Sequence, residues 1–289
     1  MRKHVIMAIA LICATTMATA QESRVYETRT VKSDILKADR SYSIYLPPGY
    51  EESDQSYPVL YLLHGSGDVH TGWVQFGQVQ NIADKVIAEG KAGPMIIVMP
   101  DAGSVRRGYF NDIKGDFNYE DFFFKELIPH IEKTYRVRSE RRYRAVSGLS
   151  MGGGGTLFYA LHHPELFAAA APLSAATGSW SVDDVKKQMG NQPGVTEEKM
   201  QQYYRRHSIE GMLSGASESE LKQIKSIRWY ISCGDEDFLS EGNSKMHVTF
   251  KKNEIPHEYR VKDGGHTWTY WRMELPIVLE FVAKSFMQH

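Results

Sequence analysis

Apolar runs of strand length alternate with helical patterns along most of the chain. Two early segments, 24–31 and 41–46, alternate polar and apolar residues, which is typical of antiparallel strands with one solvated face. Apolar runs predict parallel strands at 59–63, 95–99, 143–146, 168–173, 228–232 and 258–261. Helical patterns lie between most of these strands, at 79–89, 121–134, 156–162 and 275–286. Strands that alternate with helices predict an α/β fold with a right-handed, doubly wound and mostly parallel sheet.

One connection, 174–227, is far longer than the few residues usual between elements of such a sheet. It is charged and capable of forming helices. An insertion at this place would lie over the carboxyl edge of the sheet, so we expect residues 177–227 to form a helical cap that shapes a pocket. A surface decoration that never touches a ligand is the alternative. Trp180, at the start of the segment, could anchor the cap or form a pocket wall.

The segment Gly148-Leu149-Ser150-Met151-Gly152 fits the G-x-S-x-G nucleophile elbow, in which a serine lies on a sharp turn between a strand and a helix. The predicted strand 143–146 precedes this segment and the predicted helix 156–162 follows it. Such a turn strains the backbone of the serine and exposes its hydroxyl above the sheet, while the glycines allow close packing. The pentapeptide alone is a weak signal, and the flanking elements are what favour Ser150 as a nucleophile.

An acid and a histidine follow Ser150 in the chain order that this elbow requires. The acid lies in Asp235-Glu236-Asp237 after one predicted strand, and chemistry alone does not choose among the three. His266 follows the last predicted strand. The imidazole would take the proton of the serine, and the carboxylate would fix the imidazole tautomer. His64 precedes the serine, so we interpret it as a residue of the oxyanion loop.

An oxyanion hole is predicted from the loop His64-Gly65-Ser66-Gly67, which follows the strand 59–63. In this arrangement one backbone N–H comes from that loop and the other from the residue after the nucleophile. Here those residues are Ser66 and Met151. Backbone donors of this kind commonly contribute about 3 kcal/mol each to transition-state stabilisation.

Composition agrees with one catalytic domain. The chain has 289 residues, of which 42% are hydrophobic, and no linker, repeat or low-complexity tract divides it. Without residues 1–20 it carries 32 basic and 35 acidic residues, a balance that suggests neither nucleic acid nor an anionic membrane as a partner. The histidines lack metal-ligand spacing, so we expect no metal and no cofactor.

The first twenty residues resemble a signal peptide. Arg2-Lys3 is followed by an apolar core and by Ala18-Thr19-Ala20, a cleavage site before Gln21. Lipidation at Cys13 is the less favoured alternative, because bulky residues precede that cysteine. Cleavage would leave Cys233 alone, without a partner for a disulfide, and we interpret it as a buried filler. A bacterial periplasmic or secreted protein is therefore expected, with residues 21–289 as the catalytic domain.

Several motifs together resemble the putative-esterase (esterase D-like) family. They are His64-Gly65-Ser66-Gly67, the run from Tyr119 to Pro129, Gly148 to Gly153, His163-Pro164-Glu165-Leu166-Phe167 and Gly264-Gly265-His266-Thr267-Trp268. The family includes feruloyl esterases of xylan-degrading bacteria, S-formylglutathione hydrolases and mycolyltransferases, and it implies an α/β-hydrolase fold and acyl-ester chemistry. In the feruloyl esterases the acid ends a Gly-x-x-Asp motif, and this resemblance favours Asp237.

The expected function is a secreted serine carboxylesterase that acts on feruloyl or acetyl esters of plant cell-wall xylan. An acyltransferase would use the same residues and deliver the acyl group to a sugar hydroxyl, and a non-catalytic carbohydrate-binding protein is a further alternative. Trp73 and Trp268 lie near the motif loops, and together with Trp180 of the cap segment they are candidates to stack on a sugar or a phenolic acyl group.

Overall fold

The computed structural model describes residues 22–103 and 108–287. Within them, eight strands form one sheet in the order β1-β2-β4-β3-β5-β6-β7-β8. The strands are β1 (Arg24–Ser33), β2 (Ala38–Leu46), β3 (Val59–Leu63), β4 (Ile96–Pro100), β5 (Arg144–Leu149), β6 (Ala169–Leu173), β7 (Arg228–Gly234) and β8 (His257–Lys262). β2 pairs antiparallel with β1 and β4, and the other pairs are parallel. The predicted doubly wound α/β fold is confirmed.

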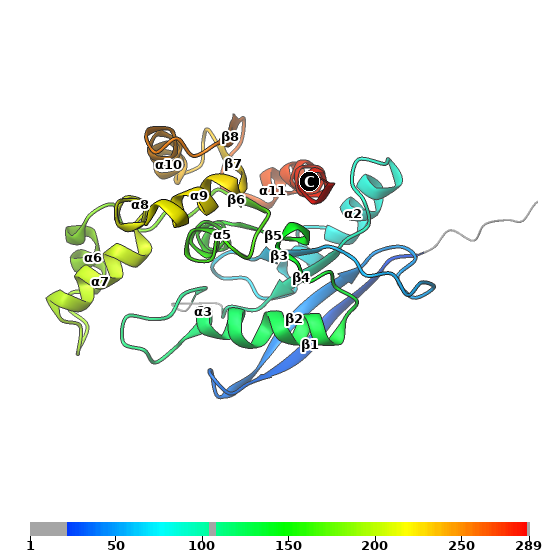
Figure 1. Ribbon diagram of the computed structural model, residues 1–289, viewed down its shortest axis with the longest axis horizontal. Helices are drawn as coiled ribbons and strands as arrows, with labels where there is room; N and C mark the ends of the chain where they lie inside the picture. The colour runs from blue at the N-terminus through cyan, green and yellow to red at the C-terminus, as the bar shows by residue number, and fades with distance from the viewer. Residues whose placement is uncertain (1–21, 104–107, 288–289) are drawn as a thin grey trace, which may run out of the picture.

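Helices cover both faces of this sheet (Figure 1). They are α1 (Gly72–Gln75), α2 (Val79–Ala88), α3 (Tyr119–Phe122), α4 (Ile128–Thr134), α5 (Met151–His162), α6 (Val182–Met189), α7 (Glu197–His207), α8 (Ile209–Gly215), α9 (Glu218–Ser226), α10 (Ser240–Lys252) and α11 (Trp268–Met287). A π-helical turn, Phe123–Leu127, joins α3 to α4, and a 3₁₀ turn, Arg141–Tyr143, precedes β5.

Two apolar cores lie on opposite faces of the sheet, because successive strand residues point to opposite sides. In β3, Tyr61 and Leu63 join one core and Leu60 and Leu62 join the other. The first core contains side chains of α5 and α10, and the second contains side chains of α2 and α11. The central strands β3 to β7 are therefore buried on both faces, which explains why they read as continuous apolar runs.

Several helices differ from the sequence prediction. α5 begins at Met151, five residues before the predicted start, and runs straight through the glycines 152–155. α11 begins at Trp268 and contains Pro276 in its interior, whereas we expected it to start at residue 275. α10 and the short α1 were not predicted.

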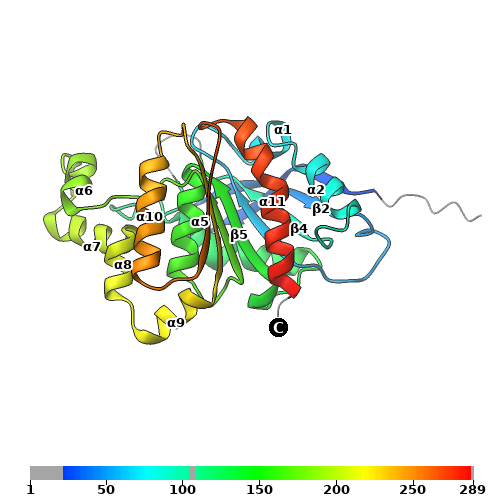
Figure 2. The same ribbon diagram turned by 90° about the horizontal axis from the view of Figure 1, so that it is seen from above.

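The long connection between β6 and β7 forms α6 to α9. Its first residues stay beside the turn at Ser150, whose carbonyl accepts the N–H of Ala176. The helices then lie beside α5 and α10, and α9 leads into β7 from the opposite end of the sheet (Figure 2). The segment is helical as predicted, but most of it flanks α5 and α10 instead of lying across the carboxyl edge of the strands.

The predicted leader, 1–20, lies outside the described residues. Among the residues that are described, no helix has the length and apolar character needed to cross a membrane. Cys233 is buried at the end of β7, and burial raises the pKa of its thiol to about 12. A thiol with such a pKa is a poor nucleophile, in agreement with its interpretation as a filler.

Candidate active site

Ser150 occupies a tight turn between β5 and α5. Its φ of 55° and ψ of −115° lie outside the regions that non-glycine residues favour. The turn is held by its backbone, since the Ser150 N–H donates to the carbonyl of Leu173 over 3.0 Å. A Cβ on Gly148 would lie 2.6 Å from the carbonyl oxygen of Gly152, and one on Gly152 would lie 2.5 Å from that of Leu63. These glycines are needed because no side chain fits where the strand and the helix meet.

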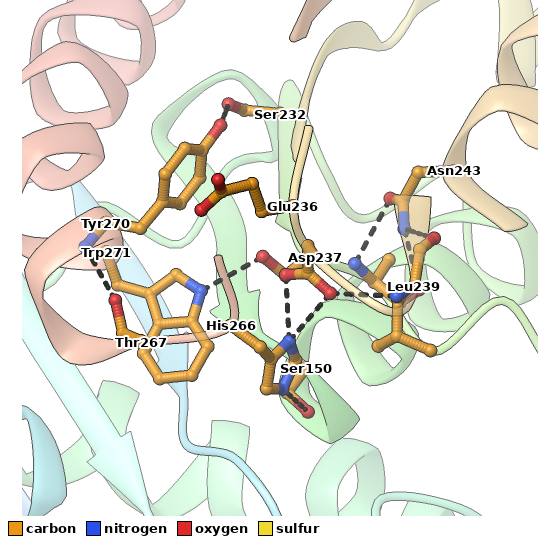
Figure 3. A network of polar contacts seen from close by, with 12 residues as sticks. Ser150, Ser232, Glu236, Asp237, Leu239, Asn243, His266, Thr267, Tyr270 and Trp271 are labelled. Carbon is orange, nitrogen blue, oxygen red and sulfur yellow. Dashed lines mark hydrogen bonds and ion pairs between the residues drawn. The ribbon is translucent and has the colours of Figure 1, made fainter. Parts of the chain in front are cut away.

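The structure brings Ser150, His266 and Asp237 together in one hydrogen-bonded chain. Nε2 of His266 lies 2.9 Å from Oγ of Ser150, and Nδ1 lies 2.8 and 3.0 Å from the carboxylate oxygens of Asp237 (Figure 3). A carboxylate only accepts, so it holds the imidazole proton on Nδ1 and leaves Nε2 free to accept the serine O–H. The arrangement can therefore remove a proton from Ser150 and return it to another oxygen.

Asp237 is buried but carries additional hydrogen bonds. Burial alone would raise the pKa of its carboxyl, but hydrogen bonds from His266, from the N–H of Leu239 (2.8 Å) and from the Ser174 side chain outweigh this effect and lower the pKa. Oγ of Ser174 in turn accepts the indole N–H of Trp271 over 3.1 Å. The acid is thus kept ionised beside His266.

The neighbouring acids take a different position. Asp235 and Glu236 are exposed, whereas Asp237 is buried. Oδ1 of Asp235 accepts the N–H of Gly264 over 3.1 Å, so this side chain supports the loop that leads to His266. Among the three acids that the sequence left open, only Asp237 contacts the imidazole.

Two further residues, Ser174 and Asn243, were missed by sequence reasoning. Ser174 follows β6 and is fully buried with a φ of 44°, a conformation that is uncommon for serine. Asn243 is also fully buried, and its side-chain amide bridges the carbonyls of Ala175 (3.0 Å) and Leu239 (2.9 Å). The position of Ser174 at the carboxyl end of a strand beside β5 was the available signal.

The predicted oxyanion loop lies against the serine. A Cβ on Gly65 would lie 3.5 Å from Cβ of Ser150, and Gly65 to Asp68 form a turn in which Gly67 has a φ of 89°. The N–H of Ser66 makes no hydrogen bond within the described part of the chain. Met151 begins α5, where the first N–H groups have no partner inside the helix and the helix dipole favours negative charge.

The side chain of His64 holds the oxyanion loop in place through hydrogen bonds. Its Nδ1 donates to the carbonyl of Gly65 over 2.8 Å, and its Nε2 accepts the N–H of Ala102 over 3.1 Å. The hydroxyl of Tyr109 donates to the carbonyl of His64. Both ring nitrogens are therefore occupied, so His64 is held in the loop and is not available as a base.

The three candidate tryptophans have different surroundings. Trp73 has no exposed surface, and its indole N–H donates to the carbonyl of Leu63 over 3.0 Å. The expectation that Trp73 contacts substrate is therefore wrong, because the ring fills the core beneath the oxyanion loop. Trp268 is half-buried and packs edge-on against Trp73 and Trp271. Trp180 is half-buried, with the ammonium of Lys245 5.9 Å from its ring centroid; substrate contact by these last two residues stays a prediction.

No group of three or more histidine, cysteine or acidic side chains suited to a metal ion is found within residues 22–103 and 108–287. The chemistry described above needs only groups that the chain itself supplies.

Several proteins with related sequences are named as esterases. The family model described as Putative esterase matches residues 33–281. An endo-1,4-beta-xylanase/feruloyl esterase of Xylanibacter ruminicola is 31% identical over 84% of this chain, which spans 28% of that protein's length. An acetyl esterase of Caldicellulosiruptor saccharolyticus is 24% identical over 80% of this chain and 85% of its own length.

Solved structures agree with this assignment. A ferulic acid esterase superposes with a TM-score of 0.79 at 33% identity, covering 91% of this chain and 99% of its own. The S-formylglutathione hydrolase FrmB of Staphylococcus aureus has a TM-score of 0.71 at 19% identity over 91% and 99% of the two chains, and this likeness concerns the fold alone. The chain therefore belongs to the esterase family of that description and has the α/β-hydrolase fold.

Proposed function

We propose that the protein is a secreted serine esterase that removes acyl groups from plant cell-wall polysaccharide, acting on feruloyl or acetyl esters of xylan through an acyl-enzyme. The observation that carries the mechanism is the hydrogen-bonded chain from Ser150 through His266 to Asp237 on a strained elbow.

In this mechanism Oγ of Ser150 attacks the ester carbonyl while Nε2 of His266 takes the hydroxyl proton. The carbonyl oxygen becomes an oxyanion, and the N–H groups of Ser66 and Met151 stabilise it. Asp237 stabilises the imidazolium without taking its proton. When the tetrahedral intermediate collapses, the bond to the alcohol breaks and His266 gives its proton to the departing oxygen. Water then attacks the acyl-enzyme by the same sequence, which releases the acid and restores Ser150.

The names of the related proteins support the substrate. The relative from Xylanibacter ruminicola is named as both a xylanase and a feruloyl esterase, and a solved relative is a ferulic acid esterase. The similarity to the acetyl esterase of Caldicellulosiruptor saccharolyticus is the reason why acetyl esters are included among the proposed substrates. The predicted leader supports secretion, which places the enzyme beside polysaccharide and away from cytosolic thioesters such as S-formylglutathione.

The test replaces the nucleophile and compares substrates. Ser150→Ala should lose on the order of a millionfold in kcat with the fold retained, because alanine leaves the elbow glycines undisturbed. Activity is measured on methyl ferulate, acetylated xylan and 4-nitrophenyl esters of increasing chain length. An alanine variant that keeps a tenth of the activity would refute the serine mechanism, and a preference for long-chain esters would refute the proposed substrate.

A further inference from the structure

Phe238 is an exposed aromatic side chain directly beside the proposed base. It is 74% exposed, more than the other large apolar side chains that the structure describes as exposed. Its ring centroid lies 4.5 Å from that of His266, with the two planes inclined by 51°. Covering this ring would gain roughly 2 kcal/mol of burial free energy, so a ligand that packs on it beside His266 would be stabilised.

The backbone that carries Phe238 is fixed on both sides. Asp237, immediately before it, is bound to His266, and Leu239, immediately after it, donates its N–H to Asp237. The buried amide of Asn243 also holds the Leu239 carbonyl (Figure 3). The backbone that carries the ring is therefore ordered before a ligand binds, which lowers the entropic cost of binding.

The chemistry of the site determines which half of an ester meets this ring. The tetrahedral carbon bonded to Ser150 has three other substituents, and each must lie in its own direction. The oxyanion points to the N–H groups of Ser66 and Met151, while the oxygen of the departing alcohol must approach Nε2 of His266 to receive its proton. The alcohol half therefore lies on the His266 side, which is the side where Phe238 stands.

We propose that Phe238 forms a subsite for the alcohol half of the ester, and that this half is a sugar ring whose C–H face stacks on the phenylalanine. This inference rests on the proposed function, since it assigns the sugar carrier, and not the acyl group, to a particular residue. Phe238 acts on the step in which the sugar is bound or released, and the acyl-enzyme that remains afterwards no longer touches it.

The test compares two esters of the same acyl group, a methyl ester and a sugar ester, such as methyl ferulate and feruloylated arabinoxylo-oligosaccharide. Phe238→Ala should lower kcat/KM for the sugar ester roughly fivefold, the size expected for one aromatic stacking contact, and leave kcat/KM for the methyl ester within about twofold. Phe238→Tyr, which keeps the ring, should restore the sugar ester, whereas Phe238→Leu should not.

Phe76 provides a matched control, because its ring is 50% exposed and packs against Trp268 instead of His266. Phe76→Ala should leave the ratio of the two substrates unchanged. An equal loss on both esters in Phe238→Ala would show that the ring only positions His266 and would overturn the subsite. No loss on either ester in Phe238→Ala would overturn the subsite as well. So would a selective loss on the sugar ester in Phe76→Ala.

A second measurement separates this inference from the proposed function. Free xylobiose should inhibit hydrolysis of any small ester that the enzyme accepts, and Phe238→Ala should raise the inhibition constant about fivefold. Absence of inhibition in the wild type would overturn the sugar subsite while the esterase activity stands. If xylan esters are not hydrolysed although xylobiose inhibits through Phe238, the proposed substrate fails and the subsite stands.

Discussion

Asp237→Asn replaces one carboxylate oxygen by an amide NH₂ and should abolish the hydrolytic activity. In the wild type, Oδ1 accepts the N–H of Leu239 over 2.8 Å while both carboxylate oxygens face Nδ1 of His266. Asparagine has a single acceptor oxygen. When that oxygen serves Leu239, the amide NH₂ faces Nδ1, which must then accept a hydrogen bond. The imidazole proton moves to Nε2, and His266 can no longer take the proton of Ser150.

The expected loss is about ten-thousandfold in kcat, the cost of a wrong tautomer in a serine–histidine–aspartate site, which corresponds to about 5.5 kcal/mol in activation free energy. The fold should persist, because the amide has the size of the carboxylate and keeps the bond to Leu239. Asp235→Asn and Glu236→Gln provide matched controls. Both acids are exposed, and asparagine at 235 still accepts the N–H of Gly264, so each variant should stay within roughly tenfold of the wild type.

The assay is steady-state hydrolysis of a 4-nitrophenyl ester, with circular dichroism and thermal unfolding to verify the fold of each variant. If Asp235→Asn were inactive while Asp237→Asn kept more than a tenth of the activity, the assignment of the acid would be wrong and the contact with His266 would have no catalytic meaning.

Three further outcomes are expected. Ser174→Ala removes a donor to Asp237 and leaves the indole N–H of Trp271 buried without its acceptor, so urea titration should show a loss of about 1–3 kcal/mol in unfolding free energy, and kcat should fall at an unchanged KM. Gly152→Ala places a Cβ 2.5 Å from the carbonyl oxygen of Leu63, so its unfolding free energy should fall by about 3 kcal/mol; an unchanged midpoint would contradict the close packing. The pKa of Asp237 is lowered in the folded protein, so this carboxylate stabilises the fold above its ordinary pKa of about 4, and the effect disappears as the pH falls through the lowered value. The stability difference between wild type and Asp237→Asn should therefore shrink as the pH falls below about 4, measured by urea titration in acid; a difference that does not change in acid would contradict this reasoning.

The sequence predicted β3 to β7 well because these strands are buried on both faces and read as apolar runs. The helices were harder where tertiary packing overrides local preference. Four glycines make the start of α5 a poor helix by propensity, and only its packing against β3 and β6 keeps it helical. α10 escaped notice because two of its buried residues, Asn243 and Thr249, are polar and interrupt the apolar period.

The site divides in the same way. Ser150 and His266 can be predicted from the elbow motif and the chain order. The choice of Asp237 as the acid depended on the resemblance to a family, because the chemistry of three consecutive carboxylates does not distinguish them. Burial separates them, and burial depends on contacts that the sequence does not display. The same limit explains why the prediction for Trp73 was wrong: this residue lies near a motif loop along the chain, but its side chain is buried in the core.

The glycines at the start of α5 also determine where this enzyme can be redesigned. A Cβ on Gly153 would lie 2.5 Å from the carbonyl oxygen of Leu173, and one on Gly154 would lie 2.4 Å from that of Ala176, so the atoms nearest to these two glycines belong to the backbone. A library aimed at new esters gains nothing by varying Gly148, Gly152, Gly153 or Gly154, because a side chain at any of these positions would disrupt the turn before it changed selectivity. Substitutions should instead be made at the rim of the candidate active site, where exposed side chains can be exchanged without moving Ser150.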